Sequence, residues 1–187
     1  MGKKSVLISL FFSLIFSFSC SLTYTNGENS EDKIPEFIFK NAQYTKYQNG
    51  KKNLQLKAEQ LEQYKSDNAV FAKNADFTSY NSEGSKETSG SCQLIAANTK
   101  KEIYNLFGDI SLSMASQEME ISANALRFNK KTEQISSGNN STVTLNKKDI
   151  QMTGKGFSAS GVSKSYSFLG GVSGKITTSA SEDGNEN

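Results

Sequence analysis

Short stretches in which apolar and polar residues alternate restrict the fold of this chain more than any other feature. They include residues 53–58, 109–114, 118–123, 141–145 and 149–153. A period of two places the apolar side chains of a strand on one face. Turn sequences such as Asn49-Gly50, Ser137-Gly138-Asn139-Asn140 and Gly170-Gly171 separate these stretches. The pattern predicts an all-β protein made of many short antiparallel strands.

One segment, residues 54–65, competes with this interpretation because it has the composition of a helix. Leucine, lysine, glutamate and glutamine dominate it, and Ala58 and Leu61 fit helical spacing. Its first five residues, however, also open a pattern that recurs at 119–123 and 150–154, where the alternation of a strand is plain. We therefore expect residues 54–65 to form a strand as well.

A small residue ends each copy of this pattern, at intervals of roughly 30 residues. The small residues are Ala58, Ala96, Ala123 and Gly154, and the copy at Ala96 is degenerate. A repeat of this length predicts stacked layers, none of which can bury its apolar face alone. Small residues let a backbone bend or another sheet approach closely. The sheet could fold along this line into a V-shaped or taco-like form, or these residues could simply pack in a core.

The N-terminal segment has the pattern of a bacterial export signal. Two lysines precede the apolar run Val6–Phe18, which is shorter than the about 20 apolar residues that a membrane-spanning helix needs. Cys20 then stands where bacterial lipoproteins carry their lipidated cysteine. We therefore expect a signal peptide over residues 1–19, then a lipidated Cys20 and a flexible tether over residues 20–34. An uncleaved short membrane anchor is the alternative.

The residue composition excludes most enzyme chemistries. The chain has no histidine and two cysteines, which removes Ser-His-Asp catalysis, Cys-His catalysis and four-cysteine metal sites. The carboxylates of Glu118 and Glu120 are expected on a solvated edge, and Cys92 is expected to be a plain thiol. A Cys20–Cys92 disulfide stays open only if Cys20 is not acylated. We therefore expect no enzyme, no cofactor and no metal site.

The charge of the chain gives no sign of a nucleic-acid partner. Lys3 and Lys4 account for the formal net charge of +2, so the remainder of the chain is neutral. The C-terminal residues 177–187 are polar and end in Glu-Asp-Gly-Asn-Glu-Asn, and we expect them to be disordered.

Five segments carry a pattern that is more specific in its order and spacing than in any single motif. The segments are residues 54–64, 105–112, 119–129, 150–159 and 168–174. Together they resemble the LptC family of the OstA/LptA-like β-jellyroll superfamily. The resemblance implies an open, layered β-jellyroll domain over residues 35–176. Two features depart from the family pattern: a cysteine, Cys20, replaces an N-terminal transmembrane helix, and residues 81–91 form a long polar insertion.

The resemblance implies a function in lipid export rather than catalysis. The protein would pass lipopolysaccharide or a related glycolipid along an apolar β-groove, from the jellyroll domains of an ABC transporter to an LptA-like bridge protein. The edge near Phe37–Phe39 would join the transporter, and the edge near Tyr166–Val172 would join the bridge. Acylated Cys20 would hold the protein in the periplasm at the inner membrane, or at the outer membrane. Candidates for the apolar lining are Phe37, Phe39, Leu54, Leu56, Val70, Phe77, Ile110, Leu112, Met119, Ile121, Leu126, Phe128, Val143, Leu145, Ile150, Met152, Phe157 and Phe168.

Two alternatives remain open at the level of the sequence. Soluble LptA-like bridge proteins share the domain, so the chain could occupy their position in the bridge. A surface or periplasmic lipoprotein with a closed β-sandwich, acting as an adhesion or scaffold module, is the alternative of a different class. Such a module would need no apolar groove, and its interior would be filled.

Overall fold

The computed structural model describes residues 34–65 and 68–177. The predicted signal peptide, Cys20, the tether up to residue 33 and the tail from residue 178 lie outside the described residues. The elements are β1 (Phe37–Gln48), β2 (Lys51–Gln63), β3 (Ala69–Tyr80), β4 (Lys86–Asn98), β5 (Ile103–Met114), η4 (Ala115–Gln117), β6 (Met119–Asn129), β7 (Gln134–Ser136), β8 (Thr142–Lys147), β9 (Ile150–Ser160) and β10 (Ser165–Ile176). In this part of the chain, no helix is long and apolar enough to cross a membrane.

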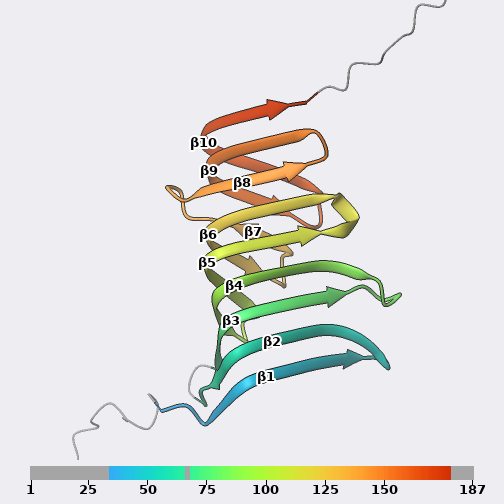
Figure 1. Ribbon diagram of the computed structural model, residues 1–187, viewed down its shortest axis with the longest axis vertical. Coiled ribbons are helices and arrows are strands. Elements are labelled where there is room, and N and C mark those ends of the chain that lie inside the picture. Colours follow the sequence, from blue (N-terminus) through green and yellow to red (C-terminus); the bar gives the residue numbers. More distant parts are fainter. Residues whose placement is uncertain (1–33, 66–67, 178–187) are drawn as a thin grey trace, which may run out of the picture. The chain divides into compact units, whose positions relative to one another are not determined.

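The strands form one antiparallel sheet in which neighbours in the sequence are mostly neighbours in space (Figure 1). The order is β1-β2-β3-β4-β5-β6-β7-β9-β10, and β8 pairs with both β6 and β9. β7 and β8 therefore share one position between β6 and β9, as two pieces of an interrupted strand. The all-β prediction is confirmed.

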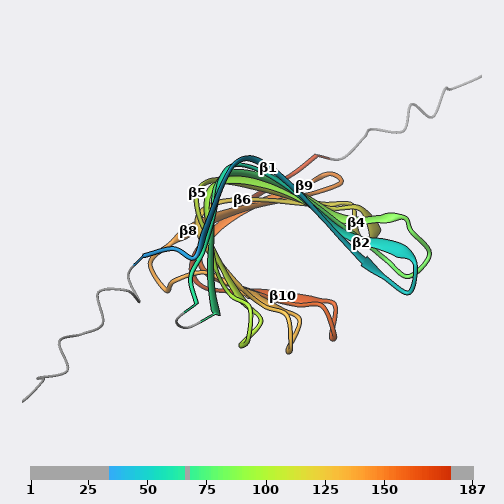
Figure 2. The ribbon, with the colours of Figure 1, turned by 90° about the horizontal axis from the view of Figure 1, so that it is seen from below.

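The sheet bends across the middle of its strands, so that it curves round one of its own faces (Figure 2). Mostly small residues lie along this bend on the inner face, and strand register makes all of them neighbours except Cys92 and Ile110, where the register of β4 with β5 shifts. We call this row the bend line; it consists of Ala58, Ala75, Cys92, Ile110, Ala123, Val143 and Gly154. Three of the four predicted small residues belong to it, which favours the folded sheet over ordinary core packing.

Ala96 does not belong to the bend line, so the prediction that it occupies the same place in the repeat as Ala58, Ala123 and Gly154 was wrong. Ala96 pairs with Phe71 and Asn105, away from the bend. Cys92 takes its place, because the register of β4 on β3 sets Cys92 opposite Ala75. A buried cysteine is a small, mostly apolar residue and serves the same packing role as alanine.

The bend needs backbone conformations that ordinary strands do not have. Asn41, Asn74 and Asp109 have positive φ angles of 51°, 46° and 44° in mid-strand, and Asn and Asp tolerate this region best among non-glycine residues. In β3, two exposed residues, Lys73 and Asn74, separate buried Ala72 from buried Ala75. This interruption shifts the alternation by one residue without changing the register of β3 with β2 or β4, and it keeps the apolar side chains of both halves of the strand on the inner face.

Polar side chains on the outer face of the bend bond to one another. The Asn74 side-chain amide donates a hydrogen bond to Glu59 (2.6 Å), and that of Gln93 donates one to Asp109 (2.7 Å). The backbone N–H of Asp109 donates to the Asn124 side-chain oxygen (3.3 Å). The Asn124 side chain thus satisfies a backbone donor at the place where the register of β5 with β6 shifts.

Other local predictions had mixed outcomes. Residues 54–65 lie largely in β2, so the strand interpretation is confirmed over the helix. Gly170-Gly171 is not a turn but lies within β10, where the register with β9 shifts between Gly170 and Ser173. Residues 81–91, which we expected to be a polar insertion relative to the family, form the turn after β3 and the first half of β4. This part of β4 is rich in serine and threonine and has few apolar residues, so the alternation pattern did not identify it as a strand.

Candidate functional site

The inner face of the sheet carries apolar side chains from β1 to β10, with polar residues such as Ser79 and Lys147 near one end of the strands. At its centre Ile121, Val143 and Leu145 have no exposed surface at all, and Phe157 is almost equally buried. Adjacent strands bring these side chains together, since Ile121 pairs with Leu145. The buried side chains belong to one connected cluster that extends from β2 to β9.

The predicted lining residues differ widely in exposure, although they lie along one sheet. Eight are buried: Ile110, Leu112, Met119, Ile121, Leu126, Val143, Leu145 and Phe157. Seven are half-buried: Leu54, Leu56, Val70, Phe77, Phe128, Met152 and Phe168. Three are exposed: Phe37, Phe39 and Ile150. The buried ones pack against one another, whereas the exposed ones lie on β1 or at the start of β9.

Several inner-face residues were missed from the sequence. Ala72, Leu106 and Tyr104 belong to or pack on the buried cluster, and so do Ile95 and Ile135. The interruption of each strand at the bend separates most of them from the clear alternating runs, so a period of two does not reach them. Their signal appears only when the alternation is continued through the bend with a shift of one residue.

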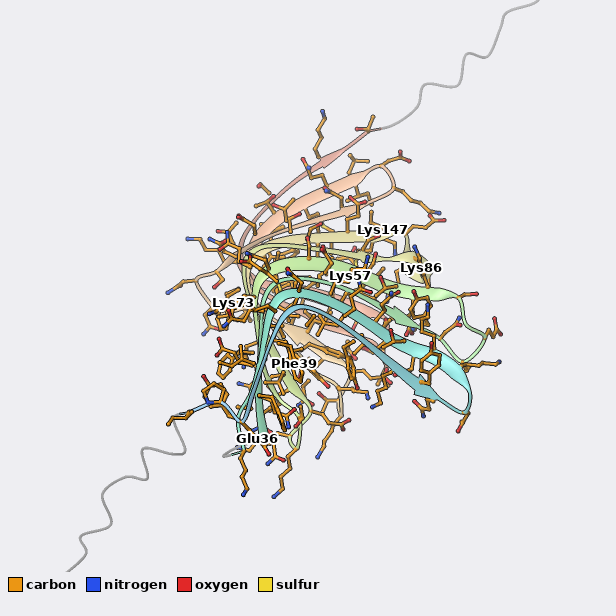
Figure 3. All side chains as sticks on the ribbon, turned by 60° about the horizontal axis from the view of Figure 1, so that its bottom comes forward. Glu36, Phe39, Lys57, Lys73, Lys86 and Lys147 are labelled. Carbon is orange, nitrogen blue, oxygen red and sulfur yellow. The ribbon has the colours of Figure 1, made fainter. Side chains whose placement is uncertain are left out.

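The N-terminal end of the inner face is uncovered. Phe37 and Phe39 stack with ring centroids 6.1 Å apart, and 51% of Phe39 is exposed. Phe39 pairs with Leu61, whose neighbour Ala72 is buried, so Phe39 lies on the inner side of the bent sheet (Figure 3). Among the described residues, β1 pairs only with β2, which leaves its other edge without a partner strand.

The C-terminal end is uncovered in the same way. Val172 is 54% exposed and Ile176, which pairs with Ile150, is 69% exposed, and β10 pairs only with β9 within the described chain. Phe168, by contrast, packs on Phe157 with ring centroids 5.2 Å apart. A Cβ atom on Gly154 would lie 2.7 Å from the Phe168 ring, so the absence of a side chain at Gly154 makes room for Phe168.

The comparisons with known proteins agree with this architecture. A family model described as "LptC: Lipopolysaccharide-assembly, LptC-related" matches residues 6–177. The chain belongs to the LptC family. A comparison with curated proteins gave no match.

Membership of the LptC family assigns the protein to lipopolysaccharide transport and assembly. The family is periplasmic and associated with the inner membrane, and its members are transport components rather than enzymes. The match begins at Val6, the first residue of the N-terminal apolar run, so this run is part of the family pattern.

Glu118, Glu120 and Cys92 lie in two different environments of this LptC-family domain. Glu118 forms an exposed ion pair with Lys148 (3.3 Å), beside a surface hollow of about 330 Å³ that Glu120 also lines. Burial raises the pKa of the Cys92 thiol to about 11, so the thiol is protonated at neutral pH. No cluster of acidic or cysteine side chains suited to a metal ion occurs in residues 34–65 and 68–177.

Proposed function

We propose that this protein carries lipopolysaccharide or a related glycolipid along the inner face of its sheet. The lipid would arrive from the jellyroll domains of an ABC transporter at β1 and leave to an LptA-like bridge protein at β10. The observation that carries the proposal is the apolar inner face, which continues from β1 to β10 and is uncovered at both ends. A closed sandwich would have no such ends, and the described residues form a single sheet.

Partner proteins would bind at the two free edges of the sheet, β1 and β10. An edge strand offers unpaired N–H and C=O groups to which another chain can add a strand. A partner strand on β1 or β10 would extend the sheet, and its inner side chains would cover Phe39 or Val172. The apolar inner face would then continue from one protein into the next without contact with water.

Acyl chains gain enough free energy on this face to leave water. Each buried methylene contributes about 0.8 kcal/mol, so a chain of ordinary length contributes several kcal/mol. Because Ile121, Val143 and Leu145 are fully covered, a passing lipid must take the place of contacts between the two halves of the sheet. The bend line is where those halves join, and its small side chains let them separate with little rearrangement.

Membrane anchoring through an acylated Cys20 is part of the same proposed function. Removal of residues 1–19 and acylation of Cys20 would hold the domain at the membrane, with residues 20–34 as its tether. A mature N-terminus at Cys20 carrying acyl groups, seen by mass spectrometry of the membrane fraction, would support this route. An intact Met1 would instead establish the uncleaved anchor.

Site-specific photocrosslinking in native membranes tests the transfer function. A photoreactive residue replaces Phe39 at the uncovered end or Phe128 farther along the inner face. The control position is Lys57, which lies between the inner residues Leu56 and Ala58 and therefore points outward (Figure 3). We expect ATP-dependent glycolipid adducts from the two inner positions and none from Lys57.

The opposite result has a clear meaning. Absence of adducts from Phe39 and Phe128, in protein that is folded and membrane-associated, would contradict lipid passage. The filled centre of the sheet would then support the adhesion or scaffold alternative.

A further inference from the structure

The chain without Lys3 and Lys4 is formally neutral, but its folded domain is basic. Residues 34–177 contain 18 lysine and arginine residues and 13 aspartate and glutamate residues, a net charge of +5. Acidic residues in the flanking segments, such as Glu31 and Glu182, bring the average back to neutral. The distribution of charge within the domain therefore says more about its ligands than the total does.

Much of this positive charge lies on one series of hairpin turns. The turns at residues 99–102, 130–133 and 161–164 connect β4 to β5, β6 to β7 and β9 to β10. They contain five lysines and two carboxylates. We call this series the lysine rim; its lysines are Lys100, Lys101, Lys130, Lys131 and Lys164.

Backbone hydrogen bonds join these turns to one another and to Asn68, which precedes β3. The N–H of Thr99 donates to the carbonyl of Asn68 (3.0 Å), that of Lys130 to Glu102 (3.0 Å), and that of Gly161 to Glu133 (2.8 Å). Successive hairpins are two strands apart, so the lysines recur about every 10 Å along the sheet. Figure 2 shows these hairpin ends on one side of the open part of the bent sheet.

The lysines of this rim are exposed and mostly unpaired. Lys130 forms an ion pair with Glu102 (3.5 Å), and both side chains are partly exposed, so the pair contributes little. Within the described residues no ion pair involves Lys100, Lys101, Lys131 or Lys164. These ammonium groups are free to bind anions.

The turns at the other ends of the strands differ in this respect. Residues 48–51, 81–85, 115–118 and 146–149 contain three lysines and three carboxylates. Lys51 there donates a hydrogen bond to the Ser82 carbonyl (2.8 Å), and Lys148 is paired with Glu118. The excess of free positive charge is therefore a property of one rim and not of hairpin turns in general.

The lysine rim lies directly beside the apolar inner face. Phe128 stacks with Tyr104 at 6.1 Å between ring centroids, and Lys130 follows it by two residues. Phe128 also pairs with Ile135. A molecule with acyl chains on the inner face would thus hold its head group within reach of the lysines.

We propose that the lysine rim binds the phosphate or other anionic groups of the glycolipid head while the acyl chains occupy the inner face, an inference that rests on the function proposed above. Lysine ammonium groups bind phosphate as point charges, without the fixed geometry of arginine. Lysines on successive hairpins let an anionic head pass from one turn to the next. The ligand class is therefore an anionic amphiphile rather than any acyl lipid.

A matched pair of variants and a matched pair of lipids test this proposal. The rim variant is Lys100→Gln, Lys101→Gln and Lys131→Gln. The control variant, with the same change in charge, is Lys40→Gln, Lys57→Gln and Lys155→Gln, all exposed strand residues away from the turns. Binding of the purified full chain to a bisphosphorylated lipid A and to the same lipid without phosphates is measured at low and high salt.

We expect the rim variant to bind the phosphorylated lipid about tenfold more weakly than wild type at low salt, and the difference to shrink at high salt. The control variant should bind both lipids like wild type. The rim variant should also bind the unphosphorylated lipid like wild type, because the apolar contacts are unchanged.

The other outcomes separate the two proposals. Equal binding of both lipids by all three proteins would overturn the role of the rim and leave the lipid-binding function intact. Failure of wild type to bind either lipid would overturn the lipid-binding function itself. Rim-dependent binding to vesicles of phosphatidylglycerol, without preference for the phosphorylated lipid, would show a membrane-docking surface and contradict the head-group role.

Discussion

The centre and the ends of the inner face have the same residue pattern and opposite environments. Ile121 in β6 is completely buried, whereas Phe39 in β1 follows the same alternation and is half exposed. The difference is the number of neighbouring strands, because β6 has partners on both sides and β1 on one. Burial in this domain is therefore produced by stacking, and each end is an inner surface that lacks its next layer.

The largest expected contrast between centre and end is in stability. Phe157→Ala should lower the free energy of unfolding by about 3–5 kcal/mol, because it empties a fully packed site. Phe39→Ala should lower it by about 1 kcal/mol or less, since half of that ring is already in water. Urea denaturation of both variants measures the difference. Equal losses would show that the end of the face is packed as tightly as its centre.

Substitution of two glycines by alanine tests the same contrast between the packed centre and the open end, because it adds one methyl group at each place. A Cβ on Gly90 would lie 2.7 Å from the Ser111 carbonyl oxygen and 2.6 Å from the Leu112 side chain, whereas nothing lies within 4 Å of a Cβ on Gly170. Gly90→Ala should therefore cost about 1–3 kcal/mol. Gly170→Ala should change stability by about 0.5 kcal/mol or less. Thermal unfolding of the two variants tests this, and a neutral Gly90→Ala would mean that the sheet adjusts easily at this position.

The C-terminal edge allows partner binding to be separated from folding. Val172→Arg changes an exposed side chain, so stability should change by about 0.5 kcal/mol or less while binding to an LptA-like partner falls. Phe168→Arg should instead unfold part of the domain, because Phe168 packs on Phe157. Pull-down of the partner, together with denaturation of each variant, distinguishes these effects. Undiminished capture by Val172→Arg would contradict an interface at this edge.

A smaller effect is expected from the pH dependence of stability at the bend line. The folded protein raises the pKa of Cys92 from 9.0 to about 11, so it holds this proton more tightly than the unfolded chain does. The stabilising contribution is complete below pH 9 and is lost as the pH rises towards 11.

The check is the difference in stability between wild type and Cys92→Ala, because every other titratable residue is the same in both proteins. Wild type should lose its advantage over the variant between pH 9 and 11. Parallel stability curves would show that Cys92 is not effectively shielded from water. Neither uncovered end of the described sheet contains a buried cysteine, so this dependence of stability on pH is expected only at the bend line.

The sequence predicted the strands better than it predicted their continuity. Alternation identified residues 119–123 correctly, but the strand continues through Asn124 and Ala125 to Leu126 and beyond. At the bend the alternation shifts by one residue, so one long bent strand resembles two short strands in the sequence. Cys92 and Ala96 were confused for the same reason, because register is set by strands distant in the sequence.

The candidate site was predictable in its centre and not at its borders. Nothing in the local sequence distinguishes Phe37, which is exposed, from Ile121, which is buried, because both follow the same alternation. The lysine rim escaped notice because the net charge was averaged over the whole chain. Only the topology brings Lys100, Lys131 and Lys164 to the same side of the sheet.

The near-sequential order of the strands has a consequence for how the protein is made. Most pairings join strands that follow each other in the sequence, so each loop that must close is short, and such topologies fold quickly. A chain exported with its N-terminus first can add one hairpin after another as it emerges from the translocation channel. β10 is then completed last, and its open edge is exposed only when the rest of the sheet is ready to support a partner.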